Sequence, residues 1–182
     1  MSTVTAIPYG FVGSHRGVIT VIPHPEGKSA FIVENVRSPG SNTAASGIYY
    51  VGPLPNGIDE NWEEVKYGRL IFERQSSFVE DAIRRTLPEA LQKTPSHCIF
   101  RIGGSMPKEG TVATRDQFEQ FSKRPNNQYS GFYERAAQLE QADYITAEMR
   151  EQAIAAVCGE KIDGAGNLRV KEPTKASGSR TR

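Results

Sequence analysis

The sequence predicts an α+β domain: a mostly antiparallel sheet of about five strands from the N-terminal half, packed with C-terminal helices. Three observations lead to this fold class. Segments rich in β-branched and aromatic residues, separated by Gly, Pro, Ser and Asn clusters, fill the first half. Apolar residues at helical spacing, preceded by capping residues, fill most of the second half. One further strand pattern lies between helical segments, and the order of strands first and helices afterwards favours α+β over a doubly wound fold.

The expected strands have the composition of buried sheet segments. They cover residues 17–24, 28–37, 48–54, 65–74 and 97–102. In the first strand Val18 and Ile22 fall on one face, and Ile19 and Val21 fall on the other. Strands that are apolar on both faces are usually central and covered from both sides. The polar run 38–47 predicts a loop.

The first helices are expected on either side of the last strand. Ser76 or Ser77 can cap a helix, which Pro88 should break, so that Pro88 lies in the first turn of a second short helix. Thr114 and Gln117 have the spacing of a capping box, and they predict a helix that continues through residue 123.

Two more helices follow in the sequence. Ser130 is expected to start a helix that buries four residues, Phe132, Tyr133, Ala136 and Leu139. Thr146 should cap the last helix and Gly159 should end it. Residues 161–170 suggest a small hairpin beyond that point.

The chain is expected to divide into three parts. Residues 1–16 form an extended N-terminal segment, residues 17–159 a single α+β domain, and residues 160–182 a basic, largely disordered tail. From residue 160 onward, six basic and three acidic residues give the tail a net charge of +3. Residues 171–182 contain no apolar residue larger than alanine, which is typical of disorder.

Composition excludes several classes of protein. A mean hydropathy of -0.49 and the lack of any run of ~20 apolar residues argue against a membrane protein. The N-terminus has neither the basic nor the apolar region of a secretory signal peptide. The two cysteines, Cys98 and Cys158, are too few for a disulfide scaffold, and we expect reduced thiols in a cytoplasmic protein.

Known catalytic patterns are largely missing from the sequence. The three histidines, His15, His24 and His97, have no pair at the i, i+3 or i, i+4 spacing of a helical metal site, so no metal is expected. Ser14 precedes His15 directly, but adjacent residues in a glycine-bounded loop rarely face each other as a catalytic dyad does. No Walker A motif or G-x-G-x-x-G motif is present.

One group of neighbouring residues suggests a nucleotide-binding site. Arg101 ends a strand pattern and is followed by Gly103 and Gly104, with Lys108 close behind. A strand arginine before a glycine turn resembles the cofactor-binding strand of ADP-ribosyltransferases. The resemblance implies that Arg101 holds a phosphate of NAD and that the Gln117-Phe118-Glu119 triplet supplies the family's glutamate. The chain departs from the family pattern because this triplet lies in an expected helix, whereas the family's glutamate lies in a strand-loop region.

A structural interpretation explains the same residues. In the strand over residues 97–102, Cys98, Phe100 and Ile102 alternate with His97 and Arg101, so Arg101 is expected on the solvent side. Gly103, Gly104 and Lys108 then form an ordinary glycine turn with an exposed lysine.

The leading hypothesis is a non-enzymatic binding or assembly protein, a structural subunit of a larger complex, with a protein partner or a second copy of itself and no cofactor. It is motivated by the long loops 38–47 and 52–61 and by a tail that can order on contact. The alternative is an NAD-using enzyme or effector with Arg101 as its phosphate-binding residue. The third interpretation is a nucleic-acid binder that acts through four basic residues of the tail: Lys171, Lys175, Arg180 and Arg182.

Overall fold

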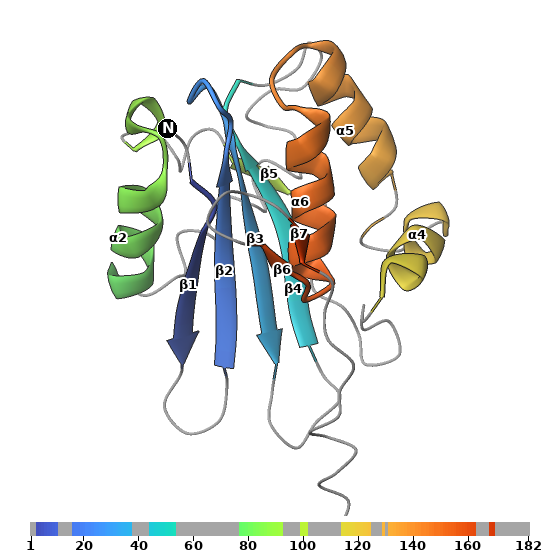
Figure 1. Ribbon diagram of the computed structural model, residues 1–182, viewed down its shortest axis with the longest axis horizontal. Helices are drawn as coiled ribbons and strands as arrows, with labels where there is room; N and C mark the ends of the chain where they lie inside the picture. Colours follow the sequence, from blue (N-terminus) through green and yellow to red (C-terminus); the bar gives the residue numbers. More distant parts are fainter. Residues whose placement is uncertain are drawn as a thin grey trace, which may run out of the picture.

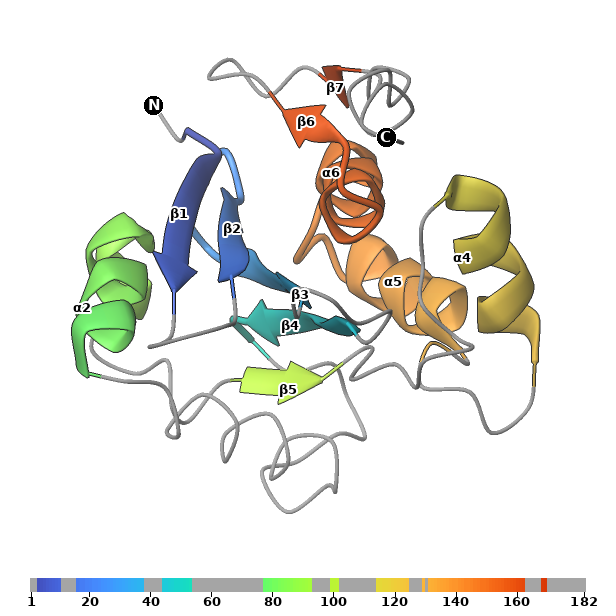
Figure 2. The same cartoon turned by 90° about the horizontal axis from the view of Figure 1, so that it is seen from below.

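The computed structural model describes residues 3–10, 16–37, 44–53, 77–92, 99–101, 114–124, 129, 131–162 and 168–169. These residues form three layers, with a twisted sheet in the middle (Figure 1). Helix α2 (Ser77–Thr86) and the 3-10 helix η1 (Glu89–Leu91) cover one face of the sheet. Helices α4 (Arg115–Lys123), α5 (Phe132–Gln141) and α6 (Ala147–Val157) lie on the other side (Figure 2).

The central sheet is an antiparallel meander. Its strands are β1 (Thr5–Gly10), β2 (Arg16–Pro23), β3 (Ala30–Arg37), β4 (Ala44–Val51) and β5 (Ile99–Arg101). They are hydrogen-bonded in sequence order, and each pairs antiparallel with the next. The prediction of an antiparallel α+β fold is therefore confirmed.

The structure departs from the sequence prediction most clearly at β1 and at the beginning of β4. Residues 1–16 are predicted only as an extended segment, yet Thr5–Gly10 forms the edge strand β1. Pro8 weakens the strand signal there, but proline is tolerated in an edge strand because one side of the strand needs no ladder hydrogen bond. The loop expected over 38–47 is also shorter, because residues 44–47 pair with β3 as the first part of β4. Pairing with a neighbouring strand outweighs the low strand propensity of these small residues. The strand expected over 65–74 lies outside the described residues.

Two of the expected helix caps, at Thr114 and Thr146, are present. Thr114 Oγ1 accepts a hydrogen bond from the Gln117 amide at 3.2 Å, and Thr146 Oγ1 accepts one from the Met149 amide at 3.1 Å. Pro88 is the residue just before η1 rather than part of its first turn. Gly131 precedes α5 directly and is its N-cap, a position that the sequence suggested for Ser130.

The last two helices end in the same way. After α6, the Glu160 amide donates to the Ala155 carbonyl and the left-handed Gly159 donates to Ala156, which is a Schellman motif and confirms Gly159 as the stop. After α5, Asp143 takes the left-handed position with φ 62°, and the Tyr144 amide donates to the Leu139 carbonyl. This second motif turns the chain directly into α6.

Two apolar cores flank the sheet, as expected for strands that are apolar on both faces. The side toward α2 is formed by Ile19, Val21, Ala30, Ile32, Tyr49, Val51, Ile83, Leu87 and Leu91. The core toward α4, α5 and α6 includes Ile22, Phe31, Val33, Ile48, Tyr50, Phe118, Phe132, Leu139, Met149, Ala153 and Val157. Helix α2 and helices α4 to α6 therefore need the sheet between them to bury their apolar faces.

Helix α6 is the most deeply buried helix of the described chain. All of its residues from Gln152 to Val157 are buried, so it has no fully solvated face in this stretch. It lies over β2, β3 and β4 on one side, and α4 and β6 (Lys161–Ile162) contact it elsewhere. Strand β6 pairs antiparallel with β7 (Leu168–Arg169), which confirms the small hairpin expected after Gly159.

Substitution of Gly52 by alanine is expected to destabilise the fold by about 3 kcal/mol. A Cβ atom at Gly52 would lie 2.6 Å from the Tyr50 hydroxyl oxygen and 2.8 Å from Ser29 Cβ, and the φ of 155° is unfavourable for alanine. Gly131→Ala is the matched control, because it also has a positive φ (75°) but its Cβ would meet nothing within 4 Å. We expect it to cost about 1 kcal/mol. Urea denaturation measures both, and equal losses would contradict the packing at Gly52.

Candidate functional site

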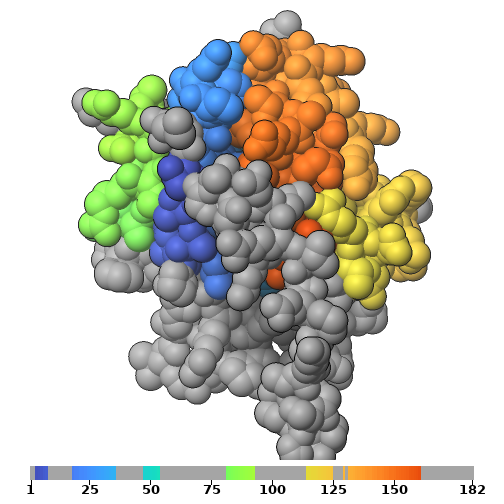
Figure 3. All heavy atoms as spheres, viewed as in Figure 1, coloured from blue at the N-terminus to red at the C-terminus, as the bar shows by residue number. Residues whose placement is uncertain are grey.

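A groove of about 730 Å³ lies between α4 and the beginning of α5. The α4 wall consists of Glu119, Ser122, Lys123 and the C-cap Arg124, and the α5 wall consists of Gly131, Tyr133 and Glu134. In the space-filling view, α4 and α5 form one side of the molecule, opposite α2 (Figure 3). The volume is in the usual range of small-ligand sites.

An exposed aromatic ring on a buried aromatic base is the main feature of the groove. Tyr133 is 40% exposed, whereas Phe118, Tyr129 and Phe132 beneath it are fully buried. The Tyr133 ring makes edge-on contacts with Phe118 and Phe132, with centroid distances of 6.1 and 5.4 Å. Phe118 in turn contacts Tyr129 and Phe132 at 5.0 and 5.1 Å. Tyr133 is thus held in place from below while part of its ring remains open to a ligand.

The exposure of Tyr133 corrects the sequence prediction. Phe132, Ala136 and Leu139 are buried as expected, but Tyr133 is not. The three buried residues have i, i+4, i+7 spacing and make one stripe along α5. Tyr133 follows Phe132 by one residue, so it is rotated by about 100° away from this stripe. Counting about 100° per residue from Phe132 therefore places Tyr133 at the edge of the core rather than within it.

Both cations in the groove already have partners on α4. Lys123 Nζ lies 3.1 Å from Glu119 Oε1, one helical turn away. The Arg124 guanidinium lies 5.0 Å from the centroid of the Phe121 ring, which is cation–π distance. Glu134 differs from these residues, because it forms no ion pair within the described part of the chain. It is an exposed carboxylate next to Tyr133 in the first turn of α5.

The electrostatic surroundings of Tyr133 favour the protonated phenol. Desolvation raises its pKa most, and the carboxylates of Glu119 and Glu151 raise it further. The guanidinium groups of Arg115 and Arg150 lower it by less. Tyr133 therefore presents a neutral hydroxyl in surroundings where negative charge outweighs positive charge.

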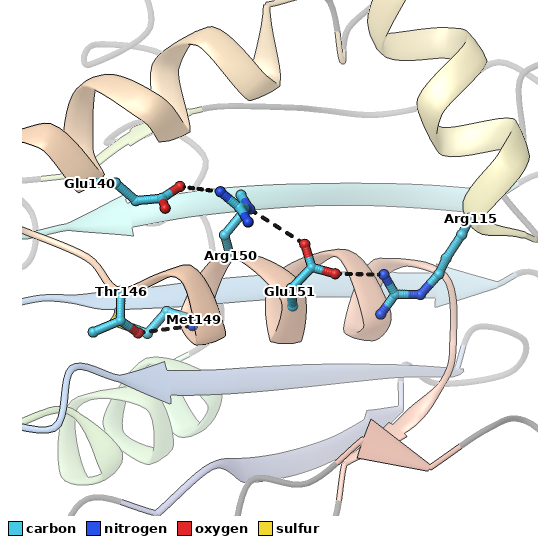
Figure 4. A network of polar contacts seen from close by, with 6 residues as sticks. All are labelled: Arg115, Glu140, Thr146, Met149, Arg150 and Glu151. Carbon is cyan, nitrogen blue, oxygen red and sulfur yellow. Dashed lines mark hydrogen bonds and ion pairs between the residues drawn. The ribbon is translucent and has the colours of Figure 1, made fainter.

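A chain of ion pairs ties the groove walls to α6 (Figure 4). From α4, Arg115 contacts Glu151 on α6 and Glu160 just beyond it, both at 2.9 Å. Arg150 on α6 contacts Glu140 on α5 and Glu151 on its own helix. Burial alone would lower the pKa of Arg115, but hydrogen bonds to Glu160 and Glu151 raise it above its usual value. This ion-pair chain, defined by Arg115, Glu140, Arg150, Glu151 and Glu160, fixes α4 and α5 relative to α6.

A second polar cluster joins the β2–β3 turn to the α5–α6 connection. Lys28 Nζ lies 2.9 Å from Asp143, and Ser29 Oγ donates to the Tyr144 carbonyl. The buried His24 accepts a hydrogen bond at Nδ1 from the Glu26 amide at 2.9 Å. Burial lowers the pKa of His24 most, and the positive charge of Lys28 lowers it further. The carboxylates of Glu26 and Asp143 raise this pKa, but by less. The cluster joins two turns, and we assign it a structural role.

The candidate nucleotide site is largely outside the described residues. Arg101 lies on β5, where its backbone is paired with Tyr49, while Gly103, Gly104 and Lys108 are not described. The Glu119 of the Gln-x-Glu triplet lies on α4, as the predicted helix implied, and it lines the groove. Strand β5 and α4 lie apart in the fold (Figure 2). The tail residues Lys171, Lys175, Arg180 and Arg182 also lie outside the described part of the chain.

Two further features are absent from the described residues, a metal-ligand cluster and a membrane-spanning helix. No group of three or more His, Cys, Asp or Glu side chains is arranged to hold a metal ion there. Within the same residues, no helix has the length and apolar character needed to cross a membrane. Cys158 is buried in the core toward α4, α5 and α6.

Comparison with known proteins does not identify a family. No family model, no curated protein and no solved structure matches the chain. The site therefore has to be interpreted from its own geometry. A held aromatic ring in an open groove, with charges on both walls, has the character of a binding site.

Arg115→Gln is expected to loosen α4, because it removes both contacts that reach α6 and Glu160. The side chains are partly exposed, so we expect a loss of about 1 kcal/mol in the local stability of α4. Faster hydrogen exchange of α4 amides, with little change in the sheet, measures this. Lys123→Gln is the matched control, since it removes only the exposed pair with Glu119. Equal exchange in the two variants would show that the ion-pair chain does not hold α4.

The lowered pKa of His24 predicts a loss of stability on mild acidification. The unfolded chain binds a proton at His24 near pH 6.5, whereas the folded chain binds it only at lower pH. Stability should therefore fall as the pH drops below 6.5. His24→Asn keeps an acceptor for the Glu26 amide but removes this titration. Urea denaturation between about pH 7 and 5 should give a shallower pH dependence for the variant, and parallel curves would contradict the assignment.

Proposed function

We propose that the protein is a non-enzymatic binding protein, a subunit of a larger complex, whose α4–α5 groove takes a segment of a partner protein. The observation that carries this proposal is the exposed Tyr133 ring on its buried base of Phe118 and Phe132. Interface energy is concentrated in a few preorganised residues, among which tyrosine is enriched. A ring fixed from below loses little conformational entropy when a partner covers it.

The chemistry of the groove supports binding more than catalysis. The seven described residues that line it include no histidine or cysteine. The Ser122 hydroxyl donates to the Glu119 carbonyl of its own helix at 2.7 Å, so it is not poised beside a base. The Tyr133 phenol is protonated at neutral pH, and the raised pKa of this group favours the same state, which suits a hydrogen-bond donor.

The shape of the groove supports a peptide segment as the occupant. Two helices form its walls, and both contribute charged side chains at the rim. A volume of about 730 Å³ holds a few side chains of a partner. The contact area at the groove is therefore smaller than the surface area that a standard protein–protein interface buries. The proposal therefore expects a weak or transient contact at the groove, or one strengthened by further surfaces of the chain. We place this function in the cytoplasm, where both cysteines would stay reduced.

Selection from a phage-displayed library of random peptides tests the proposal. The full chain is immobilised, and the selected peptides are measured against Tyr133→Ala and Gln138→Ala. Gln138 is a matched control, because it is exposed on the same helix but does not line the groove. We expect at least roughly tenfold weaker binding by Tyr133→Ala and no change for Gln138→Ala. Selected peptides that bind both variants as well as the original chain would refute the groove as the binding site.

A further inference from the structure

The carboxylates of the groove determine which partner side chain fits beside Tyr133. Each wall supplies one: Glu119 from α4 and Glu134 from α5. Glu119 is already neutralised in part by Lys123, but Glu134 is in no ion pair within the described residues. Glu134 and Tyr133 line the same groove, so a long cationic side chain that lies against the ring can extend to this carboxylate.

The cations of the groove leave this position open to a positive ligand. Lys123 is held by Glu119, and Arg124 lies against Phe121 at the C-terminal end of α4. Among the charges that shift the pKa of Tyr133, those of Glu119 and Glu151 outweigh those of Arg115 and Arg150. A partner carboxylate placed on Tyr133 would meet this negative surplus, whereas a partner cation would be attracted to it.

We infer that the partner segment carries an arginine, whose guanidinium packs against the exposed part of the Tyr133 ring and pairs with Glu134. This inference rests on the proposed function and names the chemistry of its partner. Arginine fits better than lysine for two reasons. Its planar guanidinium stacks on an aromatic face, and its fork of donors can hold a carboxylate with two parallel hydrogen bonds. A compact, strongly hydrated ammonium group does neither as well.

Titration with small probes tests the inference without knowledge of the partner. The probes are N-acetyl-arginine amide, its uncharged isostere N-acetyl-citrulline amide, and N-acetyl-lysine amide. Each is added to the isotope-labelled full chain, and amide chemical shifts are followed. We expect the arginine probe to shift the amides of Tyr133 and Glu134 more strongly than the lysine probe, and the citrulline probe to have no comparable effect.

Two substitutions then separate the charge from the ring. Glu134→Gln should weaken the binding of the arginine probe roughly threefold, as expected for an exposed ion pair. Tyr133→Leu keeps the apolar volume but removes the aromatic face, and it should weaken binding roughly fivefold. Gln138→Ala should bind as the unchanged chain does. Well-dispersed spectra confirm that each variant is folded.

The outcomes distinguish the inference from the proposed function. If the citrulline probe binds the groove as well as the arginine probe, or if Glu134→Gln has no effect, the inference is wrong. If library peptides without arginine occupy the groove and depend on Tyr133, the proposed function stands and the arginine inference fails. If neither the peptides nor the probes respond to Tyr133 substitution, both are wrong.

Discussion

The burial of α6 is the constraint on which the rest of the structure depends. The stretch from Gln152 to Val157 has no solvated face, because the sheet packs on one side and α4 and β6 contact the helix elsewhere. Its ends are fixed by the Thr146 cap and by the Schellman motif at Gly159. A helix that is held along its length and at both ends gives neighbouring elements a rigid base.

Contacts with α6 determine how the two walls of the groove are placed. Arg150 and Glu151 project from α6 into the ion-pair chain that reaches both α4 and α5, and Phe118 fixes α4 through the buried aromatic cluster. The two walls are therefore positioned by contacts that lie outside the groove itself. This arrangement leaves part of the Tyr133 ring open to a ligand, since this residue is 40% exposed. A binding surface held by a separate scaffold loses little entropy when it is covered.

The fold could be predicted from sequence far better than the site. Local signals are strong for the caps: Thr114 and Thr146 each accept the hydrogen bond that their spacing implies, and the left-handed Gly159 ends α6. The edge strand β1 and the first residues of β4 were missed, because pairing with a neighbouring strand, rather than propensity, forms them. The groove depends on how α4 and α5 meet, and contacts such as Arg115 with Glu151 join residues far apart in the chain. Arg101 lies in β5, where its backbone pairs with Tyr49 of β4, whereas two helices form the groove walls.

Photo-crosslinking in living cells tests the central claim most directly. Tyr133 is replaced by p-azidophenylalanine, which keeps an aromatic ring in the groove, and Gln138 is replaced in the same way as the control. Our account predicts that irradiation attaches one defined partner protein at position 133 and not at position 138, and that a groove-binding peptide competes with it. No adduct at position 133, or the same adducts at both positions, would contradict a binding function for the α4–α5 groove.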